Sequence, residues 1–110
     1  MPNTESAVVD RRKVVEYLLN AAHPDNGGKA RFFEGLGFSG HDPSRLVAAL
    51  HGVATSGEVV ERVESPHGEK YLVDGPLESP TGRKSQVRTV WIMDRGEQAP
   101  RLVTAYPGEE

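Results

Sequence analysis

Hydrophobic residues in the first half of the chain recur at the three- and four-residue intervals of amphipathic helices. This pattern predicts three helices, over about Arg11–Asn20, about Lys29–Leu36, and from Pro43 to the residue before Gly57. Asp10 and Asp42 stand just before the first and third of these helices. Each is expected to act as an N-cap, because an aspartate carboxylate accepts hydrogen bonds from the free amides of a first helical turn.

In the second half of the chain the period changes to the alternation that is typical of strands. Four strands are predicted, over Val59–Glu64, Tyr71–Asp74, Gln86–Asp94 and Arg101–Tyr106. Residues 75–82 are rich in glycine and proline and are expected to form a loop. Because the last two strands carry apolar residues on both faces, they are expected to be central and covered. Helices followed by consecutive strands predict an α+β fold, with about three N-terminal helices packed on one face of a four-stranded antiparallel meander.

The length of 110 residues fits one domain, expected over residues 7–107 between a flexible start, 1–6, and a tail, 108–110. Lysine and arginine number 13 against 16 aspartates and glutamates, so the net charge is −3. This balance argues against a general nucleic-acid coat protein but leaves room for a local basic site. The chain has no cysteine, which excludes disulfides, thiolate metal sites and a cysteine nucleophile. No apolar run is long enough for a membrane span and the N-terminus does not resemble a signal peptide, so a cytoplasmic protein is expected.

The segment His23–Lys29, His-Pro-Asp-Asn-Gly-Gly-Lys, joins the first two predicted helices. An imidazole can give or take a proton near neutral pH, and Lys29 at the start of a helix adds its charge to amides that attract anions. His23 and Lys29 are therefore candidates for binding a phosphate or carboxylate. In the other interpretation the segment is only a turn, in which His23 caps the carbonyls of the preceding helix and Lys29 is solvated. The four histidines show no metal-binding spacing, so no metal or other cofactor is expected.

The last two predicted strands offer a second candidate. A register that pairs Arg88 with Tyr106 and Val90 with Thr104 places Arg88, Thr104 and Tyr106 on one face. Arginine offers a planar fork of donors to a phosphate, and hydroxyl groups can orient a phosphate or relay a proton. Alternatively, Arg88 is an edge charge, Thr104 a cross-strand partner and Tyr106 an aromatic at the rim of the core.

Five segments of the chain carry a family resemblance: Arg12–Asn20, His23–Phe33, Gly37-Phe38, Val87–Trp91 and Pro100–Pro107. Together they resemble a bacterial domain family of unknown function that occurs among toxin and conflict systems, and the match extends from about residue 8 to residue 107. The layout of helices followed by a meander resembles the barnase–EndoU–colicin–RelE (BECR) superfamily of metal-independent ribonucleases.

This second resemblance implies an endoribonuclease that cleaves RNA through the ribose 2′-hydroxyl, so DNA would not be a substrate. His23 would be the acid or base. Lys29 and Arg88 would clamp the phosphate, where charge develops in the transition state. Thr104 would orient the phosphate, and Tyr106 would assist proton transfer or stack on a base.

The alternative is a non-catalytic interaction domain, such as an accessory or antitoxin-like protein, whose acidic surface binds a basic protein. The arrangement of the candidate residues separates the two hypotheses. If His23, Lys29 and the face of Arg88 converge, the enzyme is favoured; if they are dispersed, the interaction domain is favoured.

Overall fold

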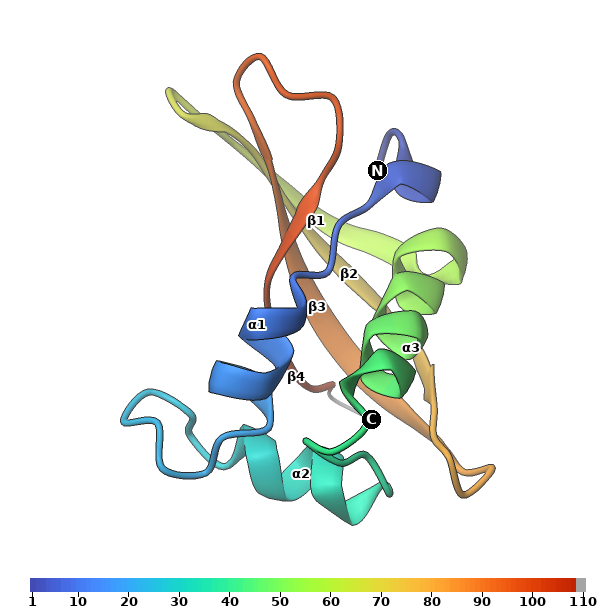
Figure 1. Cartoon of the computed structure of the whole chain (residues 1–110). Helices are drawn as coiled ribbons and strands as arrows, with labels where there is room; N and C mark the ends of the chain where they lie inside the picture. Colours follow the sequence, from blue (N-terminus) through green and yellow to red (C-terminus); the bar gives the residue numbers. More distant parts are fainter. Residues whose placement is uncertain (109–110) are drawn as a thin grey trace.

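Four consecutive strands form a single antiparallel sheet in the order β1-β2-β3-β4, and the helices precede them in the chain (Figure 1). The computed structural model describes residues 1–108. Its elements are η1 (Thr4–Ser6), α1 (Arg11–Lys13), η2 (Val14–Leu18), α2 (Lys29–Gly35), α3 (Pro43–Ser56), β1 (Glu58–Ser65), β2 (Gly68–Glu78), β3 (Lys84–Asp94) and β4 (Arg101–Pro107). The predicted α+β meander is confirmed. Of the predicted tail, 108–110, residues 109 and 110 lie outside the described part of the chain.

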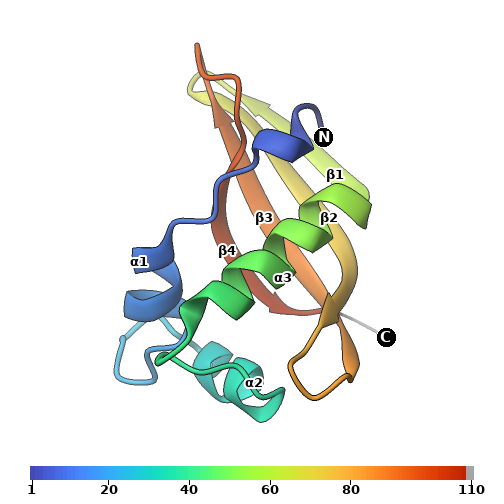
Figure 2. The same ribbon diagram turned by 45° about the vertical axis from the view of Figure 1, so that its right-hand side comes forward.

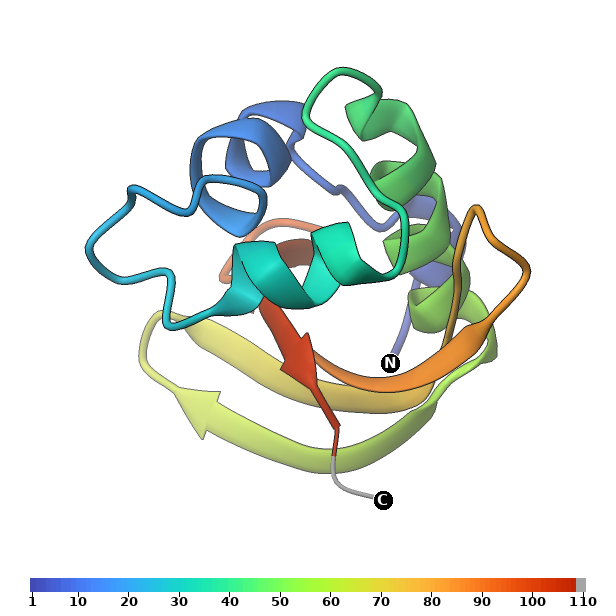
Figure 3. The same cartoon turned by 90° about the horizontal axis from the view of Figure 1, so that it is seen from below.

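The helices lie on one side of the sheet, which is visibly curved when seen from below (Figure 3). Helix α3 crosses β2 and β3 on this side (Figure 2). The core between the layers contains Trp91 of β3, Phe33 of α2, and Leu46 and Leu50 of α3, all fully buried. Trp91 is therefore a core anchor, as its position among apolar strand residues predicts. In residues 1–108, no helix has the length and apolar character that a membrane crossing requires.

A short chain of buried hydrogen bonds fixes the orientation of Trp91. The indole Nε1–H donates to Thr89 Oγ1 at 2.7 Å, and the Thr89 hydroxyl donates to the Val73 carbonyl at 2.8 Å. Thr89 is fully buried, so without these bonds its hydroxyl would carry the cost of a buried unsatisfied polar group.

The first helix is shorter and wider than the sequence predicts. Asp10 caps it as expected, accepting from the Arg12 amide at 2.8 Å. After three α-helical residues the chain continues as the π-helix η2, in which the Leu19 amide donates to the carbonyl of Val14, five residues earlier. The expected cap by Asp42 is wrong: its carboxylate accepts from the Ser44 hydroxyl at 2.6 Å and not from a backbone amide.

Strand β2 continues through much of the segment that was expected to be a loop. It runs to Glu78, which leaves only residues 79–83 as the turn. Pro76 is tolerated because β1 pairs with β2 only as far as Asp74, so no β1 ladder bond is lost there. Gly75 packs against the end of α3, where a β-carbon would lie 3.1 Å from the α-carbon of Gly57.

The two outer strands of the sheet have different surroundings. The expected central position is right for β3 but wrong for β4, which is an edge strand. Its edge is nevertheless covered. Val8 forms a parallel bridge with Arg101, and the Lys13 ammonium donates to the Val103 carbonyl at 2.9 Å. The opposite edge strand, β1, has no buried residue.

Candidate functional site

The predicted register of the last hairpin is confirmed. Arg88 pairs with Tyr106 and Val90 with Thr104, which places Arg88, Thr104 and Tyr106 on the same face of the sheet. A β-bulge interrupts the ladder between Val90 and Trp91, and Trp91 pairs with Leu102. We call Arg88, Thr104 and Tyr106 the polar strip. A bulge changes where neighbouring side chains point, and this bulge adjoins Thr104 at one end of the strip.

Arg88 is already bound to a carboxylate that the sequence analysis missed. Its Nε donates to Asp74 Oδ1 at 2.7 Å and its Nη2 to Asp74 Oδ2 at 2.9 Å, in a half-buried, bidentate pair across β2 and β3. The hydrogen bonds that Arg88 donates to Asp74 lower the pKa of Asp74 and raise the pKa of Arg88. Tyr106 also interacts with the guanidinium. Arg88 can therefore offer a ligand only those N–H groups of its guanidinium that do not bond to Asp74.

Replacing Asp74 with Asn should lower the free energy of unfolding by about 1 kcal/mol at pH 7, within the range measured for partly exposed ion pairs. The folded pKa of Asp74 is depressed, so its stabilisation is present above the unfolded pKa, about 3.9, and is lost as the pH falls through the folded value. The difference between the two proteins should therefore shrink from pH 5 to pH 3, as measured by urea unfolding.

The matched control for this prediction is Glu78→Gln, which removes the exposed carboxylate that lies 3.8 Å from the Lys84 ammonium. This variant should follow the wild-type pH dependence. A stability difference for Asp74→Asn that stays constant down to pH 3 would show that the ion pair is not its cause.

The loop between η2 and α2 is organised by Asn26, which is almost completely buried. Its Nδ2 donates to the Tyr17 carbonyl at 2.6 Å, and its Oδ1 accepts from the Ala30 amide at 2.9 Å. One side chain thus caps the end of η2 and the start of α2. The alternative in which His23 caps the first helix is wrong in this respect, because Asn26 does so. Gly27 and Gly28 follow with φ values of 64° and 87°, a left-handed conformation that favours glycine.

His23 is oriented by its own loop. Its Nδ1 accepts from the Asp25 amide at 3.1 Å, so the neutral ring carries its proton on Nε2. The ring also meets the Tyr17 ring edge-on, with the centroids 5.0 Å apart. His23 lines a surface groove together with residues of the first helix, namely Asp10, Arg12, Lys13, Glu16 and Tyr17. The imidazole is therefore accessible, and in this tautomer it is a hydrogen-bond donor at Nε2.

Tyr17 is the residue around which most of the predicted site residues gather. The Lys29 ammonium lies 5.4 Å from the centre of its ring and the Lys13 ammonium 6.0 Å away. Burial raises the pKa of the Tyr17 phenol, but contacts with Thr104 and Lys29 and the charge of Lys29 outweigh it and lower the net pKa below its usual value. Thr104 Oγ1 is buried and makes no hydrogen bond of standard geometry with any residue in 1–108.

The predicted residues form two neighbouring groups. His23, Lys29 and Thr104 lie around Tyr17, and Tyr106 and Arg88 lie on the same face of the sheet as Thr104. The sequence analysis missed Tyr17 as a site residue, although Tyr17 lies in one of the segments that carry the family resemblance. A site with cations, hydroxyl groups and an imidazole can bind an anion and move a proton. In residues 1–108 no cluster of three or more metal-ligating side chains is found.

Comparisons with known proteins agree with this picture at the level of fold. A family model described as "Domain of unknown function (DUF6883)" matches residues 1–109. No curated protein matches the chain. Among solved structures, the chain is similar to a chain of the contact-dependent growth inhibition toxin–immunity protein complex from Klebsiella pneumoniae 342. The TM-score is 0.74, with 17% identity over 97% of each chain. At this identity the similarity shows a shared fold.

Proposed function

The chain belongs to the DUF6883 family of domains of unknown function, and from that premise we propose that it is a metal-independent endoribonuclease of a bacterial toxin system. The proposal includes a BECR-like relationship of the fold. The similarity to a chain of a growth-inhibition toxin–immunity complex supports the toxin system as the setting.

One observation carries the proposal. The Thr104 hydroxyl is buried and makes no hydrogen bond of standard geometry in residues 1–108, and contacts with Thr104 and Lys29 lower the pKa of the neighbouring Tyr17. A buried polar group without a hydrogen bond costs about 1–3 kcal/mol, so such a group calls for an explanation, and we infer that a ligand supplies the missing bond. The cation of Lys29 selects an anionic ligand. A phosphodiester group meets both requirements.

The proposed reaction begins when the ribose 2′-oxygen attacks phosphorus. The bond from phosphorus to the 5′-oxygen breaks, which yields a 2′,3′-cyclic phosphate and a 5′-hydroxyl group. The Tyr17 side chain, as the phenolate, accepts the 2′-hydroxyl proton. His23, as the imidazolium, gives its Nε2 proton to the leaving 5′-oxygen, and its Nδ1 then no longer accepts the hydrogen bond from the Asp25 amide. Lys29 and Thr104 hold the phosphate while charge builds on its oxygens.

Arg88 and Tyr106 act further along the strip. Arg88 contacts a phosphate through the guanidinium N–H groups that do not bond to Asp74. Tyr106 stacks on a base or helps to position the guanidinium. Together these contacts would recognise RNA on either side of the scissile bond.

The test is cleavage of total RNA by the purified chain in the presence of EDTA. We expect products that end in a cyclic phosphate, and no cleavage of an oligonucleotide with a 2′-deoxyribose at the scissile position. Because the substrate could be a single RNA, expression in bacteria is tested in parallel and should arrest growth. Intact RNA together with normal growth, or loss of cleavage in EDTA, would refute the proposal.

A second proposal, a non-catalytic accessory or antitoxin-like domain that binds a basic protein, is favoured by one specific observation. Arg88 is neutralised by Asp74, as expected for a structural ion pair. The same RNA assay separates the two proposals, because this domain would leave every RNA intact.

A further inference from the structure

Strand β1 is exposed along its whole length. All eight residues from Glu58 to Ser65 are exposed, and its three valines, Val59, Val60 and Val63, are 38%, 46% and 40% exposed. Valines at the edge of a sheet that face solvent are an aggregation risk unless a partner covers them.

The opposite edge of the sheet, at β4, is covered by the N-terminal segment of the chain. The Val8 amide donates to the carbonyl of Pro100, just before β4, at 2.8 Å, and the Leu102 amide of β4 donates to the Val8 carbonyl at 2.9 Å. Within residues 1–108, β1 pairs with β2 on one side and with no strand on the other. One edge of the sheet is therefore closed by the chain itself, and the other is open.

The open edge is regular over part of its length. A register shift lies between Val59 and Glu61, where a bulge disrupts the ladder. From Glu61 to Ser65 the strand pairs without interruption with Leu72 to Gly68. The bulge protects the beginning of β1 from pairing, so the regular stretch Glu61–Ser65 is the part that can accept another strand.

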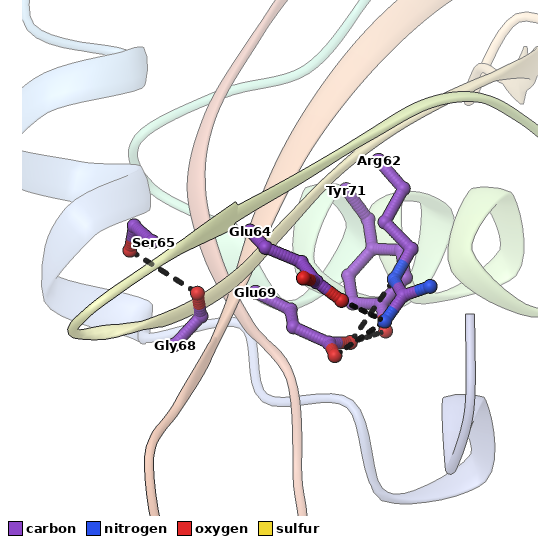
Figure 4. Close-up of polar contacts among 6 residues, drawn as sticks. All are labelled: Arg62, Glu64, Ser65, Gly68, Glu69 and Tyr71. Atoms are coloured by element: carbon purple, nitrogen blue, oxygen red, sulfur yellow. Dashed lines mark hydrogen bonds and ion pairs between the residues drawn. The ribbon is translucent and has the colours of Figure 1, made fainter.

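The charge on this edge is mostly negative. Strand β1 carries Glu58, Glu61 and Glu64 against a single arginine, Arg62. The Arg62 guanidinium donates to Glu64 at 2.9 Å and also to Glu69 of β2, so two carboxylates surround it (Figure 4). Its positive charge is therefore neutralised locally.

A cavity of about 350 Å³ at the hairpin end of the sheet extends the negative surface. Its charged lining consists of Glu64, Glu69, Asp94, Glu97 and Arg95. Glu64 and Glu69 bond to Arg62, and Asp94 bonds to Arg101, so Glu97 is the lining carboxylate for which residues 1–108 supply no ion pair. Glu97 is therefore the group in this cavity that suits a cationic side chain. It adjoins the end of the regular stretch of β1 at Ser65.

We propose that β1 accepts an extended, basic segment of a partner protein as a fifth strand of the sheet. Main-chain hydrogen bonds to Glu61–Ser65 supply affinity, and alternating side chains supply specificity. An apolar side chain of the segment covers Val63, lysines or arginines face Glu61 and Glu64, and one of them enters the cavity at the hairpin end.

Charge excludes the other occupants of this edge. A second copy of the chain would bring its own row of glutamates against the first, and RNA would bring phosphates. The strand lies at the edge opposite β4, which carries Thr104 and Tyr106, so the partner and an RNA substrate can bind at the same time. The inference is independent of the proposed ribonuclease activity.

The test uses an eight-residue capped peptide that alternates lysine and valine, titrated into the full chain at low salt. Amide shifts of the labelled protein should concentrate in β1 and its hairpin, and added salt should weaken binding. Two control peptides should not bind: one with glutamate in place of lysine, and one N-methylated at alternate residues, which keeps the charge but blocks strand pairing.

The variant Glu61→Lys should weaken binding of the basic peptide about tenfold, because it replaces an attraction with a repulsion. Glu34→Lys on α2 makes the same charge change away from the edge and should bind as the wild type does. Absence of binding, shifts outside β1 and β2, equal binding of the N-methylated peptide, or self-association of the chain through β1 would overturn the proposal.

Discussion

Replacing His23 with alanine is expected to lower the rate of RNA cleavage by about 10²–10⁴-fold, the usual contribution of a positioned general acid. The physical reason is that an imidazolium beside Tyr17 can give its Nε2 proton to the leaving oxygen, whereas alanine has no proton to give. The His23 ring meets the Tyr17 ring edge-on, with the centroids 5.0 Å apart. Alanine removes the donor but only one exposed hydrogen bond, so the free energy of unfolding should change by less than about 1 kcal/mol. Single-turnover cleavage and urea unfolding measure the two effects.

The matched control for His23→Ala is His41→Ala. His41 is an exposed histidine before α3 whose backbone amide, and not its ring, makes the contact with Ser39. This variant should cleave at the wild-type rate. If His23→Ala also cleaves at that rate while it remains folded, His23 has no part in proton transfer, and the site must lie elsewhere in the molecule.

The fold could be predicted from the sequence because its elements are marked by local patterns. Helical spacing, the N-cap Asp10 and the alternation of β3 each depend on near neighbours in the chain, and the structure confirms them. Two predictions, namely the length of β2 and the central position of β4, were wrong for a different reason. The length of β2 through Pro76 and the edge position of β4 depend on which strand lies beside each of them, and local patterns do not encode this.

The candidate site was predictable only in part. Alternation along the last hairpin fixes which residues share a face, so the pairing of Arg88 with Tyr106 follows from the pattern. Asp74 and Tyr17 were missed because they reach these residues from distant parts of the chain. Asp74 comes from β2, and Tyr17 comes from a helix whose contact with Thr104 spans most of the sequence.

Several residues of the His23–Lys29 loop are required by the turn itself. Its asparagine and two glycines are explained by structure alone, since Asn26 caps two helices and both glycines have positive φ. His23 and Lys29 also bond to the turn, since His23 Nδ1 accepts from the Asp25 amide at 3.1 Å and the Lys29 ammonium donates to the Asn26 carbonyl at 3.2 Å. A loop that is rigid at its centre and presents these two side chains at its ends is suited to hold them in position.

Replacing Asn26 with alanine should lower the free energy of unfolding by about 2 kcal/mol, because it leaves the Ala30 amide without its partner and removes one hydrogen bond to the Tyr17 carbonyl. Ala30 is fully buried, whereas the Tyr17 carbonyl keeps the hydrogen bond from the Asn20 amide at 3.2 Å. The control is Asn20→Ala, since Asn20 bonds only to neighbouring backbone, the Glu16 carbonyl and the Ala22 amide. It should cost less than about 1 kcal/mol by urea unfolding.

The variant Asn26→Asp separates the two halves of the same contact. Aspartate keeps an oxygen for the Ala30 amide but cannot donate to the Tyr17 carbonyl, and it brings a carboxylate close to that carbonyl oxygen. It should therefore destabilise the chain even though α2 remains capped. If Asn26→Asp is as stable as the wild type, the bond to Tyr17 contributes little. The end of η2, and with it the position of the Tyr17 ring between His23 and Lys29, must then be held by packing rather than by this side chain.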